Sequence, residues 1–528
     1  SQSDTEVLLH LLARQGTAAL QHVRGMFALA LWDSRHETLL LARDPFGKKP
    51  LFYSETDASF IFASEPKALL AHPDVVEDLD EPALTKYFAY EYPPSPATAF
   101  DSIKQLPEGS WLEVSAKGKK HGTHWQPAFL PKLPSEEATL LRTFDELLKQ
   151  AVRRRLVADV PVGLFLSGGL DSTTIGWYMS QLKHEEQHSF SVSFDISSFN
   201  EAEHAQLAAN ALALTHHEHE FPLETFKETV AELIPLVDMP LADASVLPTY
   251  FISKKAREEV KVILDGDGSD ELLGGYGTFA AALAADRLSL LPRSVVSTVL
   301  GAGARLLPTN LRDFSFDFKL KKFAAGLPYD RARRNQVWLG SFTEQELPEL
   351  LTEHWQEHLK QVYQPVDDLA EQITELDTTD AVSFLTTKHY MVNGILVKLD
   401  RATMYASLEA RTPFLDTDLA DFLMKLPTQH KRDKALLKKL MRGRIPESII
   451  DRPKKGFGIP LGYWLKGLLH DWACETLNED KLAEQGILRP VTVKRLLREH
   501  QSGAADHRKK LWTLLSFQLW YDEWIRYI

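Results

Sequence analysis

The stretch from Val162 to Ser172, Val-Gly-Leu-Phe-Leu-Ser-Gly-Gly-Leu-Asp-Ser, decides the fold of this chain. Its first five residues form an apolar run typical of a buried strand, and a helical pattern follows from Thr173 to Leu182. Glycines let backbone N–H groups approach an anion closely, serines add hydroxyl donors, and a helix N-terminus adds a positive dipole. The stretch therefore predicts a phosphate site.

The alternative interpretation is that glycine and serine merely form a tight strand-to-helix turn. We favour the phosphate site because strand, turn and helix follow one another in the order that such a site requires. A Walker loop is excluded, since its Gly-Lys-Ser/Thr ending is missing. The remaining interpretation is the pyrophosphate loop of enzymes that cleave ATP between its α and β phosphates. In such a loop Asp171 needs a divalent cation between its carboxylate and the phosphates.

A second candidate loop follows the apolar run from Val260 to Leu264. Its seven residues include four acids, which are Asp265, Asp267, Asp270 and Glu271. Carboxylates so close in sequence repel one another unless a cation or solvent intervenes, and Mg²⁺ is the cation we expect. Calcium is the rival, although the loop lacks the glutamate that completes an EF-hand. A solvated surface loop is the third interpretation.

Outward from these loops, short apolar runs alternate with helical patterns between residues 162 and 264. This alternation predicts an α/β fold with a parallel sheet covered by helices, and the pattern is mostly helical from Gly275 onward. The runs from Met26 to Trp32, Thr38 to Ala42 and Phe60 to Ala63 predict strands in a mixed first domain. Prolines mark the boundary, so we expect domains at 1–125 and 136–528 joined by a linker at 126–135.

The composition narrows the class of protein. The chain has 528 residues and a net charge of −13, which argues against nucleic acid as the main partner. Its single cysteine, Cys474, excludes an internal disulfide and fits a reducing compartment, so we expect a cytoplasmic protein. The most apolar stretch, from Leu288 to Pro308, contains Arg293 and Arg305, so we expect no membrane span.

The chain resembles the class B, glutamine-dependent asparagine synthetases and their relatives, from end to end. The segments that carry the resemblance, besides the two loops, are 25–28, 43–47, 63–68, 159–161, 396–401, 409–416 and 454–457. The resemblance implies a partial N-terminal-nucleophile amidotransferase domain, an α+β sandwich, followed by an ATP-pyrophosphatase domain with a five-stranded parallel sheet. In such enzymes ATP adenylylates the side-chain carboxylate of aspartate and releases pyrophosphate. Ammonia drawn from glutamine then displaces AMP and gives asparagine.

The resemblance also implies site residues by position. Those expected to contact ATP and its pyrophosphate are Leu166, Ser167, Gly168, Gly169, Asp171, Ser172, Val192, Asp265 and Gly266. Asp171 and Asp270 would hold Mg²⁺, and Asp267 stands at the position tied to forming the adenylate. Lys454 matches a lysine expected to offset charge at the α-phosphate, where positive charge favours catalysis. The alternative for Lys454 is a solvated lysine in a basic run.

The sequence departs from the family pattern at its start. The glutaminase of such enzymes begins with a nucleophilic cysteine, whereas this chain begins with Ser1. The resemblance places Ser1 late in that domain, just before Asp4, which matches an aspartate that holds the glutamine amine. We therefore expect the front of the domain to be missing, no glutamine hydrolysis by this chain as given, and synthesis from free ammonia. Asp265 stands where most relatives have serine.

The expected partners are small molecules: ATP, aspartate or another carboxylate, and ammonia or glutamine. A homodimer is one option for the assembly. Two other functions stay open, because substrate choice depends on pocket side chains that sequence alone does not place. One is amide formation on a different carboxylate, in a polysaccharide or a secondary metabolite. The other is a non-catalytic homologue.

Overall fold

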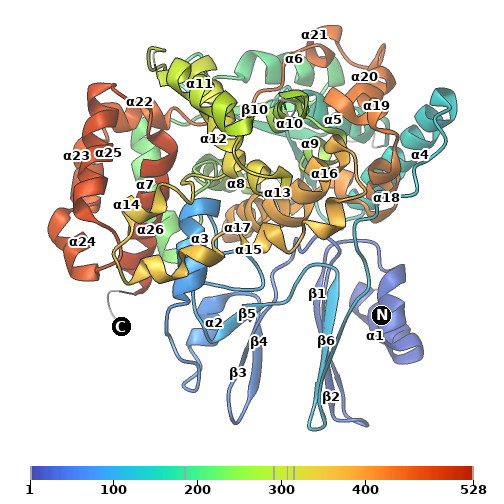
Figure 1. The fold of residues 1–528 in the computed structure, drawn as a ribbon. Helices are drawn as coiled ribbons and strands as arrows, with labels where there is room; N and C mark the ends of the chain where they lie inside the picture. Colours follow the sequence, from blue (N-terminus) through green and yellow to red (C-terminus); the bar gives the residue numbers. More distant parts are fainter. Residues whose placement is uncertain (1–2, 183–185, 289–291, 306, 313–314, 526–528) are drawn as a thin grey trace.

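The computed structural model describes residues 3–182, 186–288, 292–305, 307–312 and 315–525, so Ser1 lies outside the described residues. We refer to residues 3–125 as the first part and to residues 136–525 as the second part. Figure 1 shows the strands of the first part projecting from one side of the larger, mostly helical second part. No helix among the described residues is both long enough and apolar enough to cross a membrane.

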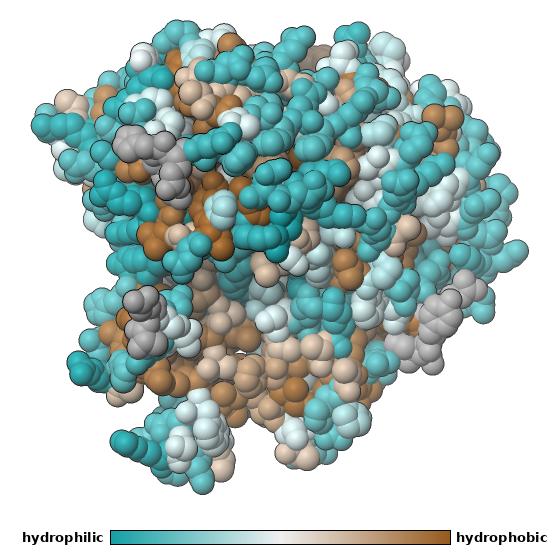
Figure 2. All heavy atoms as spheres, turned by 180° about the vertical axis from the view of Figure 1, so that it is seen from behind, coloured by the Kyte–Doolittle hydropathy of each residue, from teal (hydrophilic) through white to brown (hydrophobic). Residues whose placement is uncertain are grey.

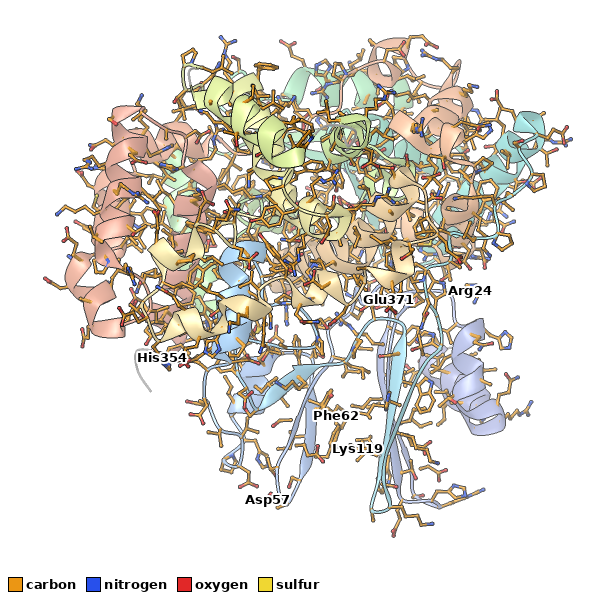
Figure 3. All side chains as sticks on the ribbon, in the orientation of Figure 1. Arg24, Asp57, Phe62, Lys119, His354 and Glu371 are labelled. Carbon is orange, nitrogen blue, oxygen red and sulfur yellow. The ribbon has the colours of Figure 1, made fainter. Side chains whose placement is uncertain are left out.

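The first part is an α+β unit built around two antiparallel sheets. One sheet has the strand order β1-β2-β6-β7 and the other has the order β4-β3-β5. Phe62 and Lys119 lie between the two sheets (Figure 3), and Lys119 forms an ion pair with Glu55 of β3. The elements are α1 (Asp4–Gln15), a 3₁₀ helix (Gly16–His22), β1 (Ala28–Asp33), β2 (Thr38–Arg43), β3 (Phe52–Glu55), β4 (Phe60–Ala63), α2 (Pro66–Leu70), α3 (Glu81–Tyr90), β5 (Ile103–Gln105), β6 (Ser110–Ser115) and β7 (Gly118–Thr123).

The second part contains the predicted five-stranded parallel sheet, with the order β10-β9-β8-β11-β12. Its strands are short and buried at the centre, where Ile263 of β11 lies beside Gly163 of β8. The strands and the helices that alternate with them are α4 (Glu137–Arg155), β8 (Val162–Phe165), α5 (Leu170–Leu182), β9 (His188–Ser193), α6 (Ala202–Leu212), β10 (Thr215–Glu220), α7 (Leu223–Leu233), α8 (Val246–Glu259), β11 (Val262–Leu264), α9 (Ser269–Leu273) and β12 (Glu409–Arg411).

The rest of the second part is helical, as the sequence predicts. A π-helix, Thr386–Ile395, leads into α17. The helices are α10 (Gly277–Arg287), α11 (Arg293–Arg305), α12 (Phe316–Gly326), α13 (Arg331–Leu339), α14 (Leu347–Leu350), α15 (Gln364–Asp367), α16 (Thr378–Leu385), α17 (Leu396–Tyr405), α18 (Thr417–Lys425), α19 (Thr428–Lys431), α20 (Ala435–Met441), α21 (Glu447–Ile450), α22 (Leu461–Lys466), α23 (His470–Thr476), α24 (Glu479–Gln485), α25 (Pro490–Ser502) and α26 (Arg508–Trp524). Short 3₁₀ turns lie at Ile234–Leu236, Trp355–Gln361, Glu371–Ile373, Pro413–Leu415 and Arg432–Lys434.

One hydrophobic core runs through both parts. It joins Tyr87 and Phe88 of α3, in the first part, to Phe517 and Trp520 of α26, and all four side chains are almost fully buried. The phenol of Tyr87 also donates a hydrogen bond of 2.9 Å to the carbonyl oxygen of Thr513. Seen from behind, the molecule gathers apolar residues in its lower half, above two projecting lobes with a hollow between them (Figure 2). The two parts therefore pack against each other as a single body.

Candidate active site

The site lies between β8 and β11, where the chain switches from adding strands on one side of β8 to adding them on the other. From β8 the chain adds β9 and β10 on one side, and it then adds β11 and β12 on the other. In open α/β sheets the loops that leave neighbouring strands at such a point diverge and form a crevice at the carboxyl ends. Here the Ser167 loop follows β8 and the Asp265 loop follows β11. A Cβ atom added to Gly266 would lie only 3.1 Å from Cβ of Asp171, so the two loops touch.

The Ser167 loop has the backbone of an anion-binding turn. Gly168 adopts φ +67°, and a Cβ atom there would lie 2.2 Å from the carbonyl carbon of His204. The N–H of Gly169 donates to Oγ of Ser167 at 3.3 Å, and the N–H of Ser167 donates to Oγ of Ser172 at 3.3 Å. The loop ends as α5 begins, so its donors lie at a helix N-terminus, which favours a bound anion.

Two carboxylates and two lysines meet beside this loop. Nζ of Lys434 lies 2.5 Å from Oδ2 of Asp171 and 2.5 Å from Oδ1 of Asp270. Nζ of Lys454 lies 2.5 Å from Oδ2 of Asp270 and 3.6 Å from Oδ2 of Asp171. The hydroxyl of Ser269 donates to Oδ1 of Asp171 at 2.7 Å. The predicted metal ligands Asp171 and Asp270 are therefore neighbours, although 99 positions separate them in the sequence (270 − 171).

The lysines control the charge of this cluster. Burial favours the neutral form of Asp270, but Lys434 and then Lys454 outweigh it and lower its pKa to about 2. Burial likewise disfavours the charged form of Lys454, yet Asp270 and Asp171 hold its pKa well above the usual value. Burial and the charge of Asp270 raise the pKa of the neighbouring Glu271 to about 7. The carboxylate of Asp270 is thus kept ionised.

The donor set fits Mg²⁺. One Lys434 ammonium already lies within 2.5 Å of both carboxylates, so a single cation can be shared between Asp171 and Asp270. Protein-bound Mg²⁺ usually takes one or two carboxylates together with substrate phosphate oxygens and water. Among the described residues, no three His, Cys, Asp or Glu side chains cluster as ligands of an all-protein metal centre. A metal here would therefore depend on phosphate oxygens from a nucleotide.

Asp265 and Asp267 form a second group of charges at the end of β11. The backbone N–H of Asp267 donates to Oδ1 of Asp265 at 2.8 Å. Burial, followed by the charge of Asp265, raises the pKa of Asp267 well above its usual value. Lys398 and Lys48 partly oppose this shift.

The other predicted residues divide into two groups. Leu166 and Val192 are buried at the ends of β8 and β9, beside the loop, and the N–H of Leu166 donates to the carbonyl oxygen of Phe190 at 2.9 Å. Lys454 forms an ion pair of 2.5 Å with Asp270, although 38% of its side chain is exposed. Asp4, by contrast, is exposed in the first turn of α1, which lies beside the strands of the first part, whereas α5, which follows the Ser167 loop, lies among the helices of the second part (Figure 1). The structure does not bring Asp4 together with the rest.

Lys434 is the site residue that sequence reasoning missed. It lies between Asp433 and α20 with φ +57°, and only 4% of it is exposed. In the sequence it ends the charged run Lys431–Lys434, a pattern typical of a solvated loop. No local pattern in the sequence therefore marks Lys434 as buried.

A cavity of about 70 Å³ lies between the two parts. Most of its lining is apolar, and its polar lining includes Arg43 and Lys48 of the first part and Asn393 and Asp400 of the second part. The ion pair between Nζ of Lys49 and Oδ1 of Asp400, at 2.8 Å, lies beside it. The cavity has room for water-sized molecules, since about 10–15 Å³ of such volume is enough for one water.

Comparison with known families decides the class of the protein. The family model described as Asparagine synthase matches residues 143–522, which is more than half of the chain, and the Glutamine amidotransferase domain model matches residues 1–125. The chain belongs to the asparagine synthase family. It is therefore an enzyme of that family, and the class recognised from the sequence motifs is confirmed.

Individual relatives agree with this membership of the asparagine synthase family. Asparagine synthetase [glutamine-hydrolyzing] 1 of Bacillus subtilis is 31% identical over 99% of this chain and 81% of its own length. A putative asparagine synthetase [glutamine-hydrolyzing] of Mycobacterium bovis is 31% identical over 99% of this chain and 80% of its own length. The amidase chyE of Penicillium rubens is 24% identical over 92% of this chain and 77% of its own length.

Proposed function

We propose that this enzyme uses ATP to convert a substrate carboxylate into an acyl adenylate, with release of pyrophosphate, and that ammonia then displaces AMP to form an amide. Aspartate is the proposed acceptor and asparagine the product. One observation supports the proposal most: Asp171 and Asp270 share the ammonium groups of Lys434 and Lys454 directly beside the Ser167 loop. Membership of the asparagine synthase family supports the same chemistry.

Each group has a proposed task. The N–H groups and hydroxyls of the Ser167 loop bind the β and γ phosphates, while Leu166, Val192, Asp265 and Gly266 line the rest of the nucleotide site. Bound Mg²⁺, held by Asp171 and Asp270, would neutralise charge between the phosphates. Lys454 offsets the negative charge that develops at the α-phosphate as the acceptor oxygen attacks. Such electrostatic stabilisation of the transition state usually contributes more to catalysis than any other single effect.

Asp267 is proposed to act at the step that forms the adenylate. Burial and the charge of Asp265 raise its pKa and so favour its protonated form, close to where the acceptor carboxylate must approach. Asp4 is proposed to be part of the glutamine-binding region, which lies in the first part. We also propose a division into a glutamine amidotransferase domain at 1–125, a linker at 126–135 and the synthetase domain at 136–528. The family matches at 1–125 and 143–522 support this division.

The cavity between the two parts is the proposed route for ammonia. Apolar walls favour neutral ammonia over the ammonium ion, which would lose its hydration there. Lys48 lines the cavity and donates a hydrogen bond of 3.4 Å to Oγ1 of Thr412, the residue that follows β12. The cavity therefore reaches the edge of the sheet on which the site is built.

An isotope experiment tests the proposal. Aspartate labelled with ¹⁸O in its side-chain carboxylate is incubated with the enzyme, ATP, Mg²⁺ and an ammonium salt, and AMP is analysed by mass spectrometry. An acyl adenylate passes one labelled oxygen to AMP, since the P–O bond forms at the acceptor oxygen and the C–O bond breaks when ammonia attacks. Unlabelled AMP, or ADP with phosphate, contradicts the mechanism. Labelled AMP with another carboxylate, but not with aspartate, changes only the acceptor.

A further inference from the structure

A strap of irregular chain carries Lys454 to the phosphate site. The strap is formed by residues 451–458, which lie between α21 and α22 and belong to neither helix nor strand. All of these residues are described, and none of them is buried. The ammonium of Lys454 reaches Oδ2 of Asp270 at 2.5 Å, but 38% of its side chain is exposed. Packing in the hydrophobic core therefore does not determine where this lysine lies.

Two side chains, one on each side of Lys454 in the sequence, tie the strap to the start of α6. The guanidinium of Arg452 donates a hydrogen bond of 2.7 Å to Oε1 of Glu201. Nζ of Lys455 donates a hydrogen bond of 3.2 Å to the carbonyl oxygen of Asn200. Asn200 and Glu201 directly precede α6, so both contacts end at the same turn of the chain.

The pair of Arg452 with Glu201, which we call the clamp, is well enclosed. Only 13% of each side chain is exposed. Burial raises the pKa of Glu201, while the charge of Arg452 and then that of Lys455 oppose the shift. Removal of one partner from an enclosed ion pair leaves the other charge without compensation, whereas an exposed pair contributes little. The clamp is therefore the contact whose loss would move the strap most.

The start of α6 also supports the Ser167 loop. The carbonyl oxygen of Glu201 accepts hydrogen bonds of 3.0 Å from the N–H groups of His204 and Ala205. An added Cβ atom at Gly168 would lie 2.2 Å from the carbonyl carbon of His204 and 2.5 Å from the nitrogen of Ala205, so the loop touches this turn. The first turn of α6 thus contacts the phosphate loop on one side and the strap on the other.

The clamp matters most once the nucleotide is bound. In the structure Lys454 pairs with Asp270 and, at 3.6 Å, with Asp171. These carboxylates are the proposed ligands of Mg²⁺, so in the loaded site Lys454 shares them with the metal. The position of its ammonium at the α-phosphate then depends on the backbone of the strap. A misplacement of about 1 Å can lower a rate by about 10²-fold.

We propose that Arg452 and Glu201 are positioning residues, which hold Lys454 at the α-phosphate through the strap. This inference rests on the proposed function. The clamp gives the ammonium of Lys454 and the Ser167 loop a common support, the first turn of α6. Arg452 and Lys454 both line a cleft of about 600 Å³, so the alternative role of Arg452 is to bind a phosphate directly.

Arg452→Met and Glu201→Ala distinguish these two roles. In the coupled assay for pyrophosphate, each variant is expected to lower kcat and kcat/KM for ATP together by about 10²-fold, and the double variant by no more than either alone. If Arg452 bound a phosphate itself, Glu201→Ala would leave its guanidinium in place and the rate unchanged. Arg452→Lys, which keeps the charge that faces Glu201, is expected to recover most of the rate.

A Lys454→Met background shows whether the clamp acts through Lys454. Arg452→Met added to Lys454→Met is expected to cause no further loss of rate, whereas a merely structural role would lower the rate in both backgrounds. Arg442→Met is the matched control. Arg442 pairs with Asp451, the residue directly before Arg452, but both side chains are exposed, so the rate is expected to stay within about twofold of the wild type.

Chemical labelling follows the position of Lys454 without catalysis. The full chain, without nucleotide, is treated with acetic anhydride, and the rate of acetylation at each lysine is measured by mass spectrometry. Arg452→Met and Glu201→Ala are expected to raise the rate at Lys454 several-fold, because the lysine then leaves Asp270 and is open to the reagent. Lys439, which lies on α20, is the internal reference, and its rate is expected to stay constant.

The outcomes separate this inference from the proposed function. An unchanged rate in Glu201→Ala, a further loss of rate in the Lys454→Met background, or unchanged labelling of Lys454 in both clamp variants overturns the inference. If the wild type releases no pyrophosphate, the proposed function fails, and the labelling of Lys454 still decides whether the clamp positions it.

Discussion

The paired carboxylates Asp171 and Asp270 depend on Lys434 as much as on Lys454. Both lysines bridge the two acids, but only Lys434 is fully enclosed, with 5% of its side chain exposed against 38% for Lys454. A buried ammonium keeps two neighbouring carboxylates ionised and together, whereas an exposed lysine is free to turn toward a phosphate. We therefore assign different tasks to the two lysines: Lys434 keeps Asp171 and Asp270 together, and Lys454 contacts the nucleotide.

Substitution of Lys434 by methionine is expected to lower kcat for pyrophosphate release by about 10²- to 10³-fold, the size of effect seen when one fixed electrostatic group is lost. The physical reason is that Asp171 and Asp270 then repel each other and move apart. The measurement is a coupled assay for pyrophosphate. Lys439→Met is the control, since Lys439 forms an exposed pair with Glu137. An unchanged rate in the Lys434 variant would show that Lys454 suffices.

His389 gives a pH dependence of stability. Its Nδ1 is 3.0 Å from the Tyr92 hydroxyl, its Nε2 has no hydrogen-bond partner in the described structure, and burial lowers its pKa to about 3. In the unfolded chain His389 binds a proton as the pH falls through about 6.5, whereas in the folded chain it does so only near pH 3. The free energy of unfolding is therefore highest above pH 6.5 and decreases as the pH falls from there toward 3. Between pH 7.5 and 5.5 this residue alone removes about 1.4 kcal/mol from the free energy of unfolding.

Urea unfolding of the wild type and of a His389→Gln variant at these two pH values checks the prediction. The wild type is expected to lose more stability on acidification than the variant does, by about the amount given above. Equal losses in both proteins would mean that His389 takes up its proton in the folded state.

Sequence reasoning found three of the four charged residues that meet at the site. The sequence indicates the chemistry of these three residues, because Asp171 and Asp270 lie in loops that contain glycine and Lys454 lies in a segment that resembles the family. Lys434 stands in a charged run, and its burial depends on the packing of α20 against α19 and α4, which no local pattern encodes. The same holds for Lys48, because its place at the second part is set by contacts between segments far apart in the sequence.

At the scale of elements, the Ser167 loop depends on one glycine more than on its neighbour. Gly168 has φ +67° and touches the backbone at His204, whereas Gly169 has ordinary φ and its nearest neighbour is Oγ of Ser167 at 3.3 Å. A side chain at Gly168 thus meets both a strained backbone and a steric clash. The loop and the start of α6 can stay in contact only while position 168 lacks a Cβ atom.

Gly168→Ala is expected to lower the free energy of unfolding by about 2 kcal/mol or more, because the left-handed conformation alone costs about 1–2 kcal/mol for an alanine. Gly169→Ala is the matched control and is expected to change stability by less than about 1 kcal/mol. Denaturant unfolding of both variants measures the difference. Equal stability of the two variants would contradict the geometry of the loop.

The strands of the central sheet were predictable in proportion to their apolar content. β8 and β11 are apolar runs, β9 alternates polar and apolar residues, and all three lie where the sequence predicts strands. β10, Thr-His-His-Glu-His-Glu, lacks an apolar run because it lies at the edge of the sheet, where burial is not needed. β12 was missed because it has only three residues, and its pairing with β11 forms across a long stretch of helices.

At the scale of the whole molecule, the continuous core predicts that the two parts unfold together. Helix α3 belongs to the first part, yet Tyr87 and Phe88 are buried against Phe517 of the second part. Ion pairs also cross between the parts, such as Arg401 with Glu65 at 2.9 Å and Arg24, labelled in Figure 3, with Asp418 at 2.8 Å. Separation of the parts would expose this apolar surface to water.

Scanning calorimetry is therefore expected to record one cooperative transition, and ATP with Mg²⁺ to shift all of it to higher temperature, since a ligand stabilises whatever unfolds together with its site. Two resolved transitions, of which only one responds to ATP, would contradict a shared core. The order of the two parts along the chain was predictable from the sequence, but the burial of α3 within the second part was not, because it depends on aromatic contacts with the C-terminal helix.

The central claim is that Asp171 and Asp270 act together on the pyrophosphate end of ATP. The most direct test follows ATP by ³¹P NMR with the enzyme, Mg²⁺, aspartate and ammonium chloride, and repeats this with D171N and D270N. We predict that the wild type forms AMP and pyrophosphate only when the carboxylate is present, and that each variant is slower by about 10²-fold or more. Formation of ADP and phosphate, or wild-type rates in both variants, would contradict the account.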